Sequence, residues 1–307
     1  MTCEIFNIEF PLCFGYSERW QSGRLHTLGK RAYRKVSRVR IPLFPPFGKE
    51  VVEGFGIKLT FIFSKKKVVV MYKDIIKDLK SMSDKKRAEK FYLFFDTKKG
   101  GYGEGDEFLG LTNPVVRGVV KKYKNTISFD DIKNLLKNPY HEVRLTALLF
   151  MVEKFNKADD AERKKLVDLY ISNAKYINNW DLVDLSVYKI LGKYCIKKND
   201  YTILYKLSET GHLWSERMSV VANWIIVRNN QFDVLLTLSK KFLSHKHDLM
   251  HKAVGWILRE MGKNSTEGYK RLIKFLDENA SVMPRTMLRY SIEKLPVKLK
   301  QKYMNMK

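Results

Sequence analysis

Hydrophobic and polar residues follow a helical period along most of the chain from Met71 onward. In the first such segment, residues 72–79, the apolar side chains of Ile75, Ile76 and Leu79 form one stripe. Similar segments follow with short breaks, and none shows the two-residue alternation of a β-strand. We therefore predict an all-α fold, with helices near residues 72–79, 83–95, from 113, 129–137, 140–155, 160–173, 180–191, 200–209, 214–228, 231–243, 248–261, 265–278 and 284–294.

Polar residues mark several helix starts. Ser83, Ser128, Asn179 and Asp248 are predicted N-caps, because their side-chain oxygens can accept hydrogen bonds from free N–H groups of the first turn. Asp131 three residues after Ser128 makes a capping box there. Glycines between Lys99 and Asp106 predict a loop, which lacks both GxxxxGK[ST] and GxGxxG and so is not a phosphate loop.

The predicted helices carry a repeat. Arg144, Asp181, Arg217 and Lys252 are separated by 37, 36 and 35 residues, and each interval holds two helices. This period is typical of helical-repeat solenoids. The tetratricopeptide consensus WxxLGxxY is absent, so we predict a HEAT-like superhelix in which every second helix lines a concave basic groove.

The face that holds these four residues also carries aromatic and acidic side chains. Trp180 lies one residue before Asp181, Asp184 lies three after it, and Trp256 lies four after Lys252. Positions at this spacing share one helical face. We expect two indoles, one carboxylate and several cations to converge on the groove, whereas a purely structural stripe would be leucine and isoleucine. The alternative for each tryptophan is ordinary core packing.

The first seventy residues differ from the rest. They hold four of the eight prolines and show no sustained helical period. The stretch from Trp20 to Pro42 resembles the translation of a transfer-RNA gene: Val39-Arg40-Ile41-Pro42 can be encoded by GTT-CGA-ATC-CC, a T-loop sequence. We hypothesise that residues 1–70 are a non-native or disordered extension and that the native protein begins at Met71. The alternative is a genuine basic arm.

Charge narrows the choice of partner. Lysine and arginine total 58 against 33 acidic residues, a net charge of +25, and residues 71–307 alone carry +17. This favours a polyanion, nucleic acid ahead of an anionic membrane surface, although a solvated basic surface is the alternative. No apolar run is long enough for a transmembrane helix.

Few residues suggest a metal or a disulfide. The three cysteines show no CxxC spacing, which argues against a zinc site and is typical of a reducing cytoplasm. The histidines at positions 245, 247 and 251 lack the HExxH pattern. We therefore expect no metal and no cofactor.

A basic groove with aromatic faces and one carboxylate suits a specific chemistry. Arginine binds phosphate and tryptophan faces attract cations. A carboxylate can stabilise an oxocarbenium-like sugar during glycosidic cleavage. An N-alkylated purine is already a cationic leaving group and needs no general acid. Trp180, Trp256 and Asp184 supply that minimal set.

Several long motifs resemble the AlkD-type DNA alkylation-repair glycosylases over about residues 71–303. They are Asn179-Trp180-Asp181-Leu182-Val183-Asp184, Leu213-Trp214-Ser215-Glu216-Arg217, the segment from His251 to Glu260, the segment from Tyr102 to Gly110 and the segment from Met283 to Tyr290. The resemblance implies a HEAT-like solenoid that excises purines alkylated at a ring nitrogen.

The resemblance also implies roles. Asp184 would be the catalytic carboxylate, Trp180 and Trp256 would pack on the lesion nucleotide, and Arg217 would lie near the DNA backbone. Lys252 and Arg144 are further candidate DNA contacts from the repeat. We expect a cytoplasmic, nucleoid-associated monomer that acts on duplex DNA containing 3-methyladenine or 7-methylguanine. The rival is a non-catalytic HEAT-like scaffold for nucleic acid or an acidic protein, which has no need of Asp184 and its two tryptophans.

Overall fold

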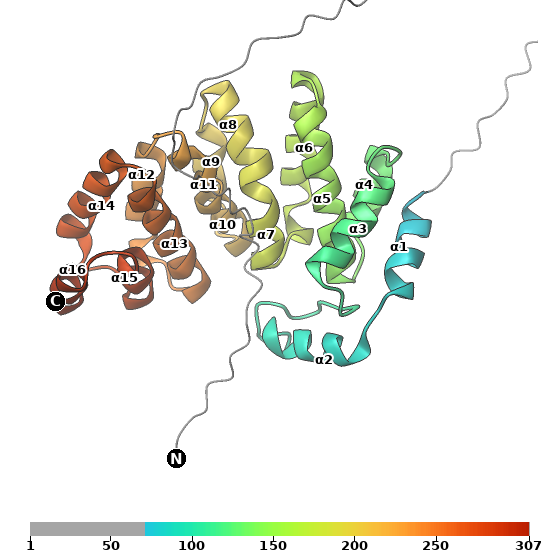
Figure 1. Ribbon diagram of the computed structural model, residues 1–307, viewed down its shortest axis with the longest axis horizontal. Helices are drawn as coiled ribbons and strands as arrows, with labels where there is room; N and C mark the ends of the chain where they lie inside the picture. The colour runs from blue at the N-terminus through green and yellow to red at the C-terminus, as the bar shows by residue number, and fades with distance from the viewer. Residues whose placement is uncertain (1–70, 307) are drawn as a thin grey trace, which may run out of the picture. The chain divides into compact units, whose positions relative to one another are not determined.

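The computed structural model describes residues 71–306, and this part of the chain consists of helices joined by short turns, without a β-strand (Figure 1). A single isolated bridge joins Glu107 to Tyr140. The α-helices are α1 Met71–Ser81, α2 Lys85–Phe94, α3 Asn113–Tyr123, α4 Phe129–Leu136, α5 His141–Lys157, α6 Asp160–Ser172, α7 Trp180–Val187, α8 Lys193–Lys198, α9 Thr202–Leu207, α10 Leu213–Val221, α11 Asn223–Arg228, α12 Asp233–Lys241, α13 Asp248–Asn264, α14 Thr266–Asn279, α15 Arg285–Ile292 and α16 Val297–Asn305. Shorter turns are η1 Ala174–Tyr176, η2 Tyr188–Gly192 and η3 Phe242–Ser244.

One row of helices runs through this unit. α5 packs on α7, α7 on α10, α10 on α13 and α13 on α15. The residues that define the predicted repeat, Arg144, Asp181, Arg217 and Lys252, lie on the first four helices of this row in order. The all-α helical-repeat prediction is therefore confirmed. The hypothesis about residues 1–70 lies outside the described residues.

The core is continuous along the row. Buried side chains from Ile75 in α1 to Tyr303 in α16 form one hydrophobic cluster. A second, small cluster consists of Ala88, Phe95 and Phe108, with Phe91 and Trp180 packed against it. This small cluster attaches α2 and the loop that follows it to the N-terminal end of α7.

Two of the four predicted caps are confirmed, and two are wrong by one residue. Ser128 and Asp131 form the capping box of α4, and the side chain of Asn179 accepts from the N–H of Trp180. The N-cap of α2 is Asp84 rather than Ser83, since the Asp84 carboxylate accepts from the Arg87 N–H. His247, not Asp248, caps α13, because its ring nitrogen accepts from the N–H of Leu249.

Helix boundaries differ from the prediction in three places. The helix that begins at Trp180 continues through the π-helical turn η2 into α8. Gly192, the last residue of η2, lies so close to the N-cap of α11 that a Cβ there would lie 2.5 Å from the Ala222 carbonyl oxygen. The predicted helix 214–228 is interrupted between α10 and α11. The last helix, α16, follows Pro296 and was not predicted.

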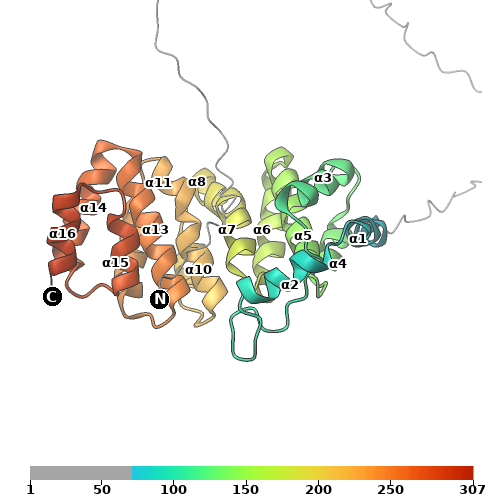
Figure 2. The same cartoon turned by 60° about the horizontal axis from the view of Figure 1, so that its bottom comes forward.

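The loop between α2 and α3 is held by a buried acid. Both carboxylate oxygens of Glu142 in α5 accept backbone N–H groups, from Leu109 at 3.0 Å, Gly110 at 2.8 Å and Leu111 at 3.0 Å. Gly110 has a φ of +76°, and a Cβ there would lie 2.1 Å from the Asp84 carbonyl oxygen. In Figure 2, α2 comes forward beneath the row of helices.

Candidate functional site

The first turn of α7 supplies the aromatic part of the site. The N-cap Asn179 starts the helix, so Trp180 and Asp184 lie four residues apart on one face. The indole N–H of Trp180 donates to the Tyr102 hydroxyl at 3.3 Å. The ring contacts Phe94 and Phe95 with centroid separations of 5.9 and 5.6 Å. Trp180 is half-buried and its orientation is set by α2 and its loop.

Asp184 and Arg217 form a bidentate ion pair between α7 and α10. The guanidinium Nε donates to Oδ1 at 2.9 Å and Nη2 donates to Oδ2 at 2.7 Å. The Asp184 side chain is 16% exposed and that of Arg217 is 5% exposed. Burial raises the pKa of the Asp184 carboxyl above its usual range, and the charge of Arg217 opposes that rise. Arg217 thus holds a largely desolvated carboxylate in place.

Arg217 also connects this pair to α13. Its Nη1 donates to the carbonyl oxygen of Leu249 at 2.5 Å, so three of its nitrogens are engaged by protein acceptors. The predicted contact of Arg217 with the DNA backbone stays a prediction. In this structure, Arg217 holds the Asp184 carboxylate through two hydrogen bonds.

α13 contributes Lys252 and Trp256. The ammonium of Lys252 lies 2.8 Å from the Asp248 carboxylate, and its side chain is 40% exposed. Trp256 is half-buried and packs against the main core cluster. Burial raises the pKa of the Tyr102 phenol, while the nearby charge of Lys252 lowers it. Lys252 is thus near the Tyr102 loop and keeps a solvent-facing charge.

Arg144, the remaining predicted DNA contact, is buried. Its Nη2 donates to the Asp106 carboxylate at 2.6 Å, and its Nη1 donates to the carbonyl oxygens of Asn138 at 3.0 Å and Pro139 at 2.7 Å. The side chain is 5% exposed. Arg144 therefore ties the α2–α3 loop to α5 and presents no free charge to a ligand in this arrangement.

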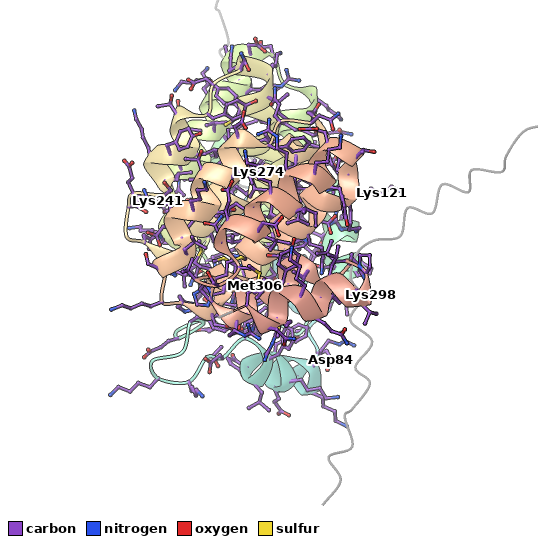
Figure 3. The ribbon with its side chains drawn as sticks, turned by 90° about the vertical axis from the view of Figure 1, so that its left-hand side faces the viewer. Asp84, Lys121, Lys241, Lys274, Lys298 and Met306 are labelled. Atoms are coloured by element: carbon purple, nitrogen blue, oxygen red, sulfur yellow. The ribbon has the colours of Figure 1, made fainter. Side chains whose placement is uncertain are left out.

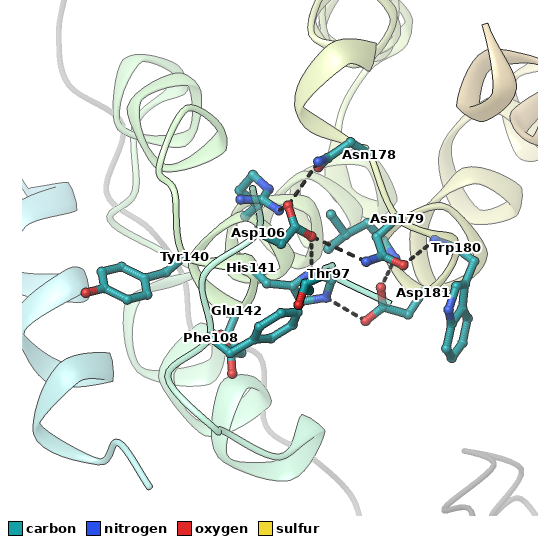
Figure 4. Close-up of polar contacts among 12 residues, drawn as sticks. Thr97, Asp106, Phe108, Tyr140, His141, Glu142, Asn178, Asn179, Trp180 and Asp181 are labelled. Carbon is teal, nitrogen blue, oxygen red and sulfur yellow. Dashed lines mark hydrogen bonds and ion pairs between the residues drawn. The ribbon is translucent and has the colours of Figure 1, made fainter. Parts of the chain in front are cut away.

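A buried network beside Trp180 was not predicted from the sequence (Figure 4). The ring of His141 lies between two carboxylates, with Nδ1 3.3 Å from Asp106 and Nε2 2.8 Å from Asp181. Asp106 also accepts from the side-chain amides of Asn178 at 3.0 Å and Asn179 at 3.3 Å. The network joins the α2–α3 loop, α5 and the start of α7.

The two carboxylates keep the imidazole charged. Burial acts against the protonated ring, yet the charge of Asp181 and hydrogen bonds to both carboxylates raise the pKa of His141 to about 9. Burial likewise opposes ionisation of Asp106, but His141 and Arg144 hold the pKa of that carboxyl below its usual range. Phe108 stacks on the His141 ring at 5.0 Å and Phe95 lies 4.9 Å from it. The cation is therefore enclosed by acids and aromatic rings.

Asp106 lies in the motif from Tyr102 to Gly110, and Asp181 lies in the motif from Asn179 to Asp184. Both motifs carry the family resemblance, but the sequence predicted no role for either aspartate. His141 carried no signal of its own. Among residues 71–306, no group of three or more histidine, cysteine or acidic side chains is arranged to hold a metal ion. No helix in the same range is long and apolar enough to cross a membrane.

The fold and site define an all-α helical-repeat protein with an aromatic site built around a desolvated carboxylate. A family model described as "DNA alkylation repair enzyme" matches residues 75–295. The chain belongs to that family. No curated protein matches. A solved structure described as a predicted DNA alkylation repair enzyme from Enterococcus faecalis is similar in fold, with a TM-score of 0.55 and 15% identity over 70% of this chain and 97% of that chain.

Proposed function

We propose that this member of the DNA alkylation repair family is a DNA glycosylase that excises N-alkylated, cationic purines such as 3-methyladenine and 7-methylguanine from duplex DNA. The observation that carries the proposal is the Asp184 carboxylate, held on both oxygens by Arg217 and placed on the same face of α7 as Trp180. Trp180, Trp256 and Lys252 then bind the lesion and its flanking backbone.

The chemistry needs an anion beside the sugar. When the N-glycosidic bond of an alkylated purine breaks, its electron pair leaves with the base, and positive charge develops on the deoxyribose. A fixed carboxylate stabilises that charge more strongly in a desolvated site than in water. Asp184 meets both conditions, because Arg217 fixes it and its side chain is 16% exposed.

The base requires a surface rather than an acid. The alkylated ring is cationic before cleavage, and cations are attracted to indole faces by about 0.5–2 kcal/mol. Trp180 is already held in one orientation by Tyr102 and Phe95. Preorganisation of this kind lowers the cost of ordering a side chain on binding.

The test is release of methylated bases from duplex DNA by the full chain and by Asp184→Asn. The parent should release 3-methyladenine or 7-methylguanine, and the variant should not. The substitution keeps the size of the side chain but removes the anion, so duplex affinity should be unchanged or raised. Asp168→Asn, which alters an exposed carboxylate paired with Lys164 on α6, is the matched control and should keep full activity.

The second candidate is a non-catalytic nucleic-acid scaffold. It is favoured by the same ion pair, since both Asp184 oxygens are engaged as they would be in a purely structural salt bridge. Base release by neither protein, with salt-sensitive duplex binding retained, would favour this scaffold. Equal release by parent and Asp184→Asn would remove Asp184 from catalysis.

A further inference from the structure

α2 has two faces of different character. Ala88 and Phe91 pack inward with Phe95, which follows the helix, at the i, i+3, i+7 spacing of a helical stripe. The opposite stripe carries Lys86, Lys90 and Leu93 at i, i+4 and i+7, and all three are exposed. We call these three residues the α2 stripe. It spans seven residues, a rise of about 10 Å.

The lysines of the α2 stripe differ from many other exposed lysines of residues 71–306 in forming no ion pair there. Many exposed lysines of this chain pair with acids, as Lys122 does with Asp78 and Lys302 with Asp277. Within residues 71–306, neither Lys86 nor Lys90 has such a partner. Helix α2 therefore presents two unpaired positive charges one turn apart, a spacing that suits successive phosphates of a nucleic-acid strand.

The third member of the stripe is apolar. Leu93 is 87% exposed, and its neighbours Tyr92 and Phe94 are 39% and 44% exposed. A single exposed leucine is ordinary, but a leucine between two partly exposed aromatic rings forms a contiguous apolar tip. Proteins that approach DNA from the minor groove commonly insert such apolar side chains beside basic ones.

The tip is continuous with the site. The Phe94 ring lies 5.9 Å from that of Trp180. The Tyr102 hydroxyl accepts from the Trp180 indole and donates to the Phe94 carbonyl oxygen, both at 3.3 Å. A duplex whose lesion lies on Trp180 would therefore pass next to α2. The loop that follows adds Lys98 and Lys99, both exposed.

We propose that the α2 stripe is a second DNA-binding surface, in which Lys86 and Lys90 contact the phosphate backbone and Leu93 enters the minor groove beside the lesion site. This inference rests on the proposed function for its partner, duplex DNA. It adds a contact on α2, which packs against Trp180 but is not one of the helices α7, α10 and α13 that carry the predicted site residues.

The experiment measures affinity for an unmodified duplex across a salt series, with the full chain. Lys86→Gln/Lys90→Gln should lower the slope of log affinity against log salt by about 2, since each phosphate contact contributes about 0.9. The matched control is Lys274→Gln/Lys298→Gln, which removes the same charge from exposed positions on α14 and α16. Both control lysines are labelled in Figure 3, where α2 lies at the bottom of the view.

Leu93→Ser separates the apolar contact from the electrostatic one. It should weaken duplex binding about threefold to tenfold with the salt slope unchanged, because the lost contact is apolar. All these positions are exposed, so melting temperatures should stay at the parent value. A parental slope in the Lys86/Lys90 variant, or an equal fall in the control, would overturn the proposal.

Base release is measured separately. A parent that releases no base but whose salt slope depends on Lys86 and Lys90 would contradict the glycosylase proposal and keep the α2 surface. If the parent releases methylated bases and the Lys86/Lys90 variant keeps the parental salt slope, the glycosylase proposal stands and the α2 surface is contradicted.

Discussion

The guanidinium of Arg217 grips both carboxylate oxygens of Asp184, at 2.9 and 2.7 Å, and reaches the Leu249 carbonyl with its remaining Nη. One side chain thereby links α7, α10 and α13 at the centre of the candidate site. Arg217 stands at the same position of the repeat as Asp181, which lies 36 residues earlier in the chain. Because the Asp184–Arg217 pair is largely buried, its loss should change both the free energy of unfolding and the pKa of Asp184.

Removal of Arg217 should destabilise the protein and alter the titration of Asp184. Arg217→Ala leaves a buried carboxylate without its counter-ion, which costs about 3–5 kcal/mol of unfolding free energy. The pKa of Asp184, already raised by burial, should rise further without Arg217. As the pH is lowered, the variant should therefore lose the ionised carboxylate, and the activity that needs it, at a higher pH than the parent does. Urea unfolding and a pH profile of base release measure both effects.

The control for this prediction is the double variant Asp184→Asn/Arg217→Ala. A neutral amide at position 184 needs no counter-ion, so the double variant should lose less stability than Arg217→Ala alone. If the loss of stability in the double variant equals the sum of the losses in Asp184→Asn and Arg217→Ala, the ion pair is not the source of the destabilisation.

Tyr102→Phe should reduce base release while leaving the fold intact. The substitution removes the acceptor for the Trp180 indole N–H, a hydrogen bond worth about 1 kcal/mol, and frees the ring to adopt other orientations. We expect a loss of about fivefold in the rate of base release with little change in affinity for an unmodified duplex. Tyr269→Phe, on the surface of α14, should have no effect. Equal behaviour of the two variants would mean that Tyr102 does not position Trp180.

The charge on His141 predicts a pH dependence of stability. Its pKa is raised from 6.5 to about 9 in the folded protein, so its contribution is fully present below pH 6.5 and is lost as pH rises towards 9. The contribution is on the order of 3 kcal/mol. Urea unfolding of the parent and of His141→Gln at pH 6 and pH 9.5 should show a stability difference that shrinks at the higher pH. A constant difference would mean that folding does not raise the pKa of His141.

Glu142→Gln should loosen the α2–α3 loop. The carboxylate accepts three backbone N–H groups, and a glutamine offers a single acceptor oxygen in the same place. Buried donors left without a partner cost about 1–3 kcal/mol. Amide hydrogen exchange should therefore rise at Leu109, Gly110 and Leu111 while the amides of α13 stay protected. Unchanged exchange in the loop would show that another contact anchors it. Glu153→Gln, which alters a partly exposed acid on the same helix, is the control.

Local sequence was enough for most of the helices and for their order, although it missed α16 and the interruption between α10 and α11. The apolar stripes, the capping box at Ser128 and the cap at Asn179 involve residues within four positions of one another, so a linear pattern reports them directly. The 35–37-residue spacing correctly placed Arg144, Asp181, Arg217 and Lys252 on successive packed helices. The two misplaced caps, at Ser83 and Asp248, lay beside a second residue able to cap.

The environment of each repeat position could not be read in the same way. Arg144 and Arg217 occupy equivalent slots with the same side chain, and sequence treated both as groove cations. Arg144 is buried because Asp106, 38 residues earlier in the chain, pairs with it. α5 is buried on nearly all sides, and His141 and Glu142 are among its buried residues. It therefore has no separate polar face, and a helical period in the sequence could not indicate that these residues have buried partners.

The sequence by itself determined that this is an all-α repeat, that Ser128 and Asn179 cap two of its helices, and that Trp180 and Asp184 share a face, since these follow from short-range patterns. Only the tertiary structure decided that Asp184 is clamped by Arg217, that His141 is enclosed by Asp106 and Asp181, and that α2 packs against Trp180. These contacts join segments 33 to 86 residues apart in the chain. Burial by itself disfavours the charged groups among them, and they are stabilised because the fold brings opposite charges together.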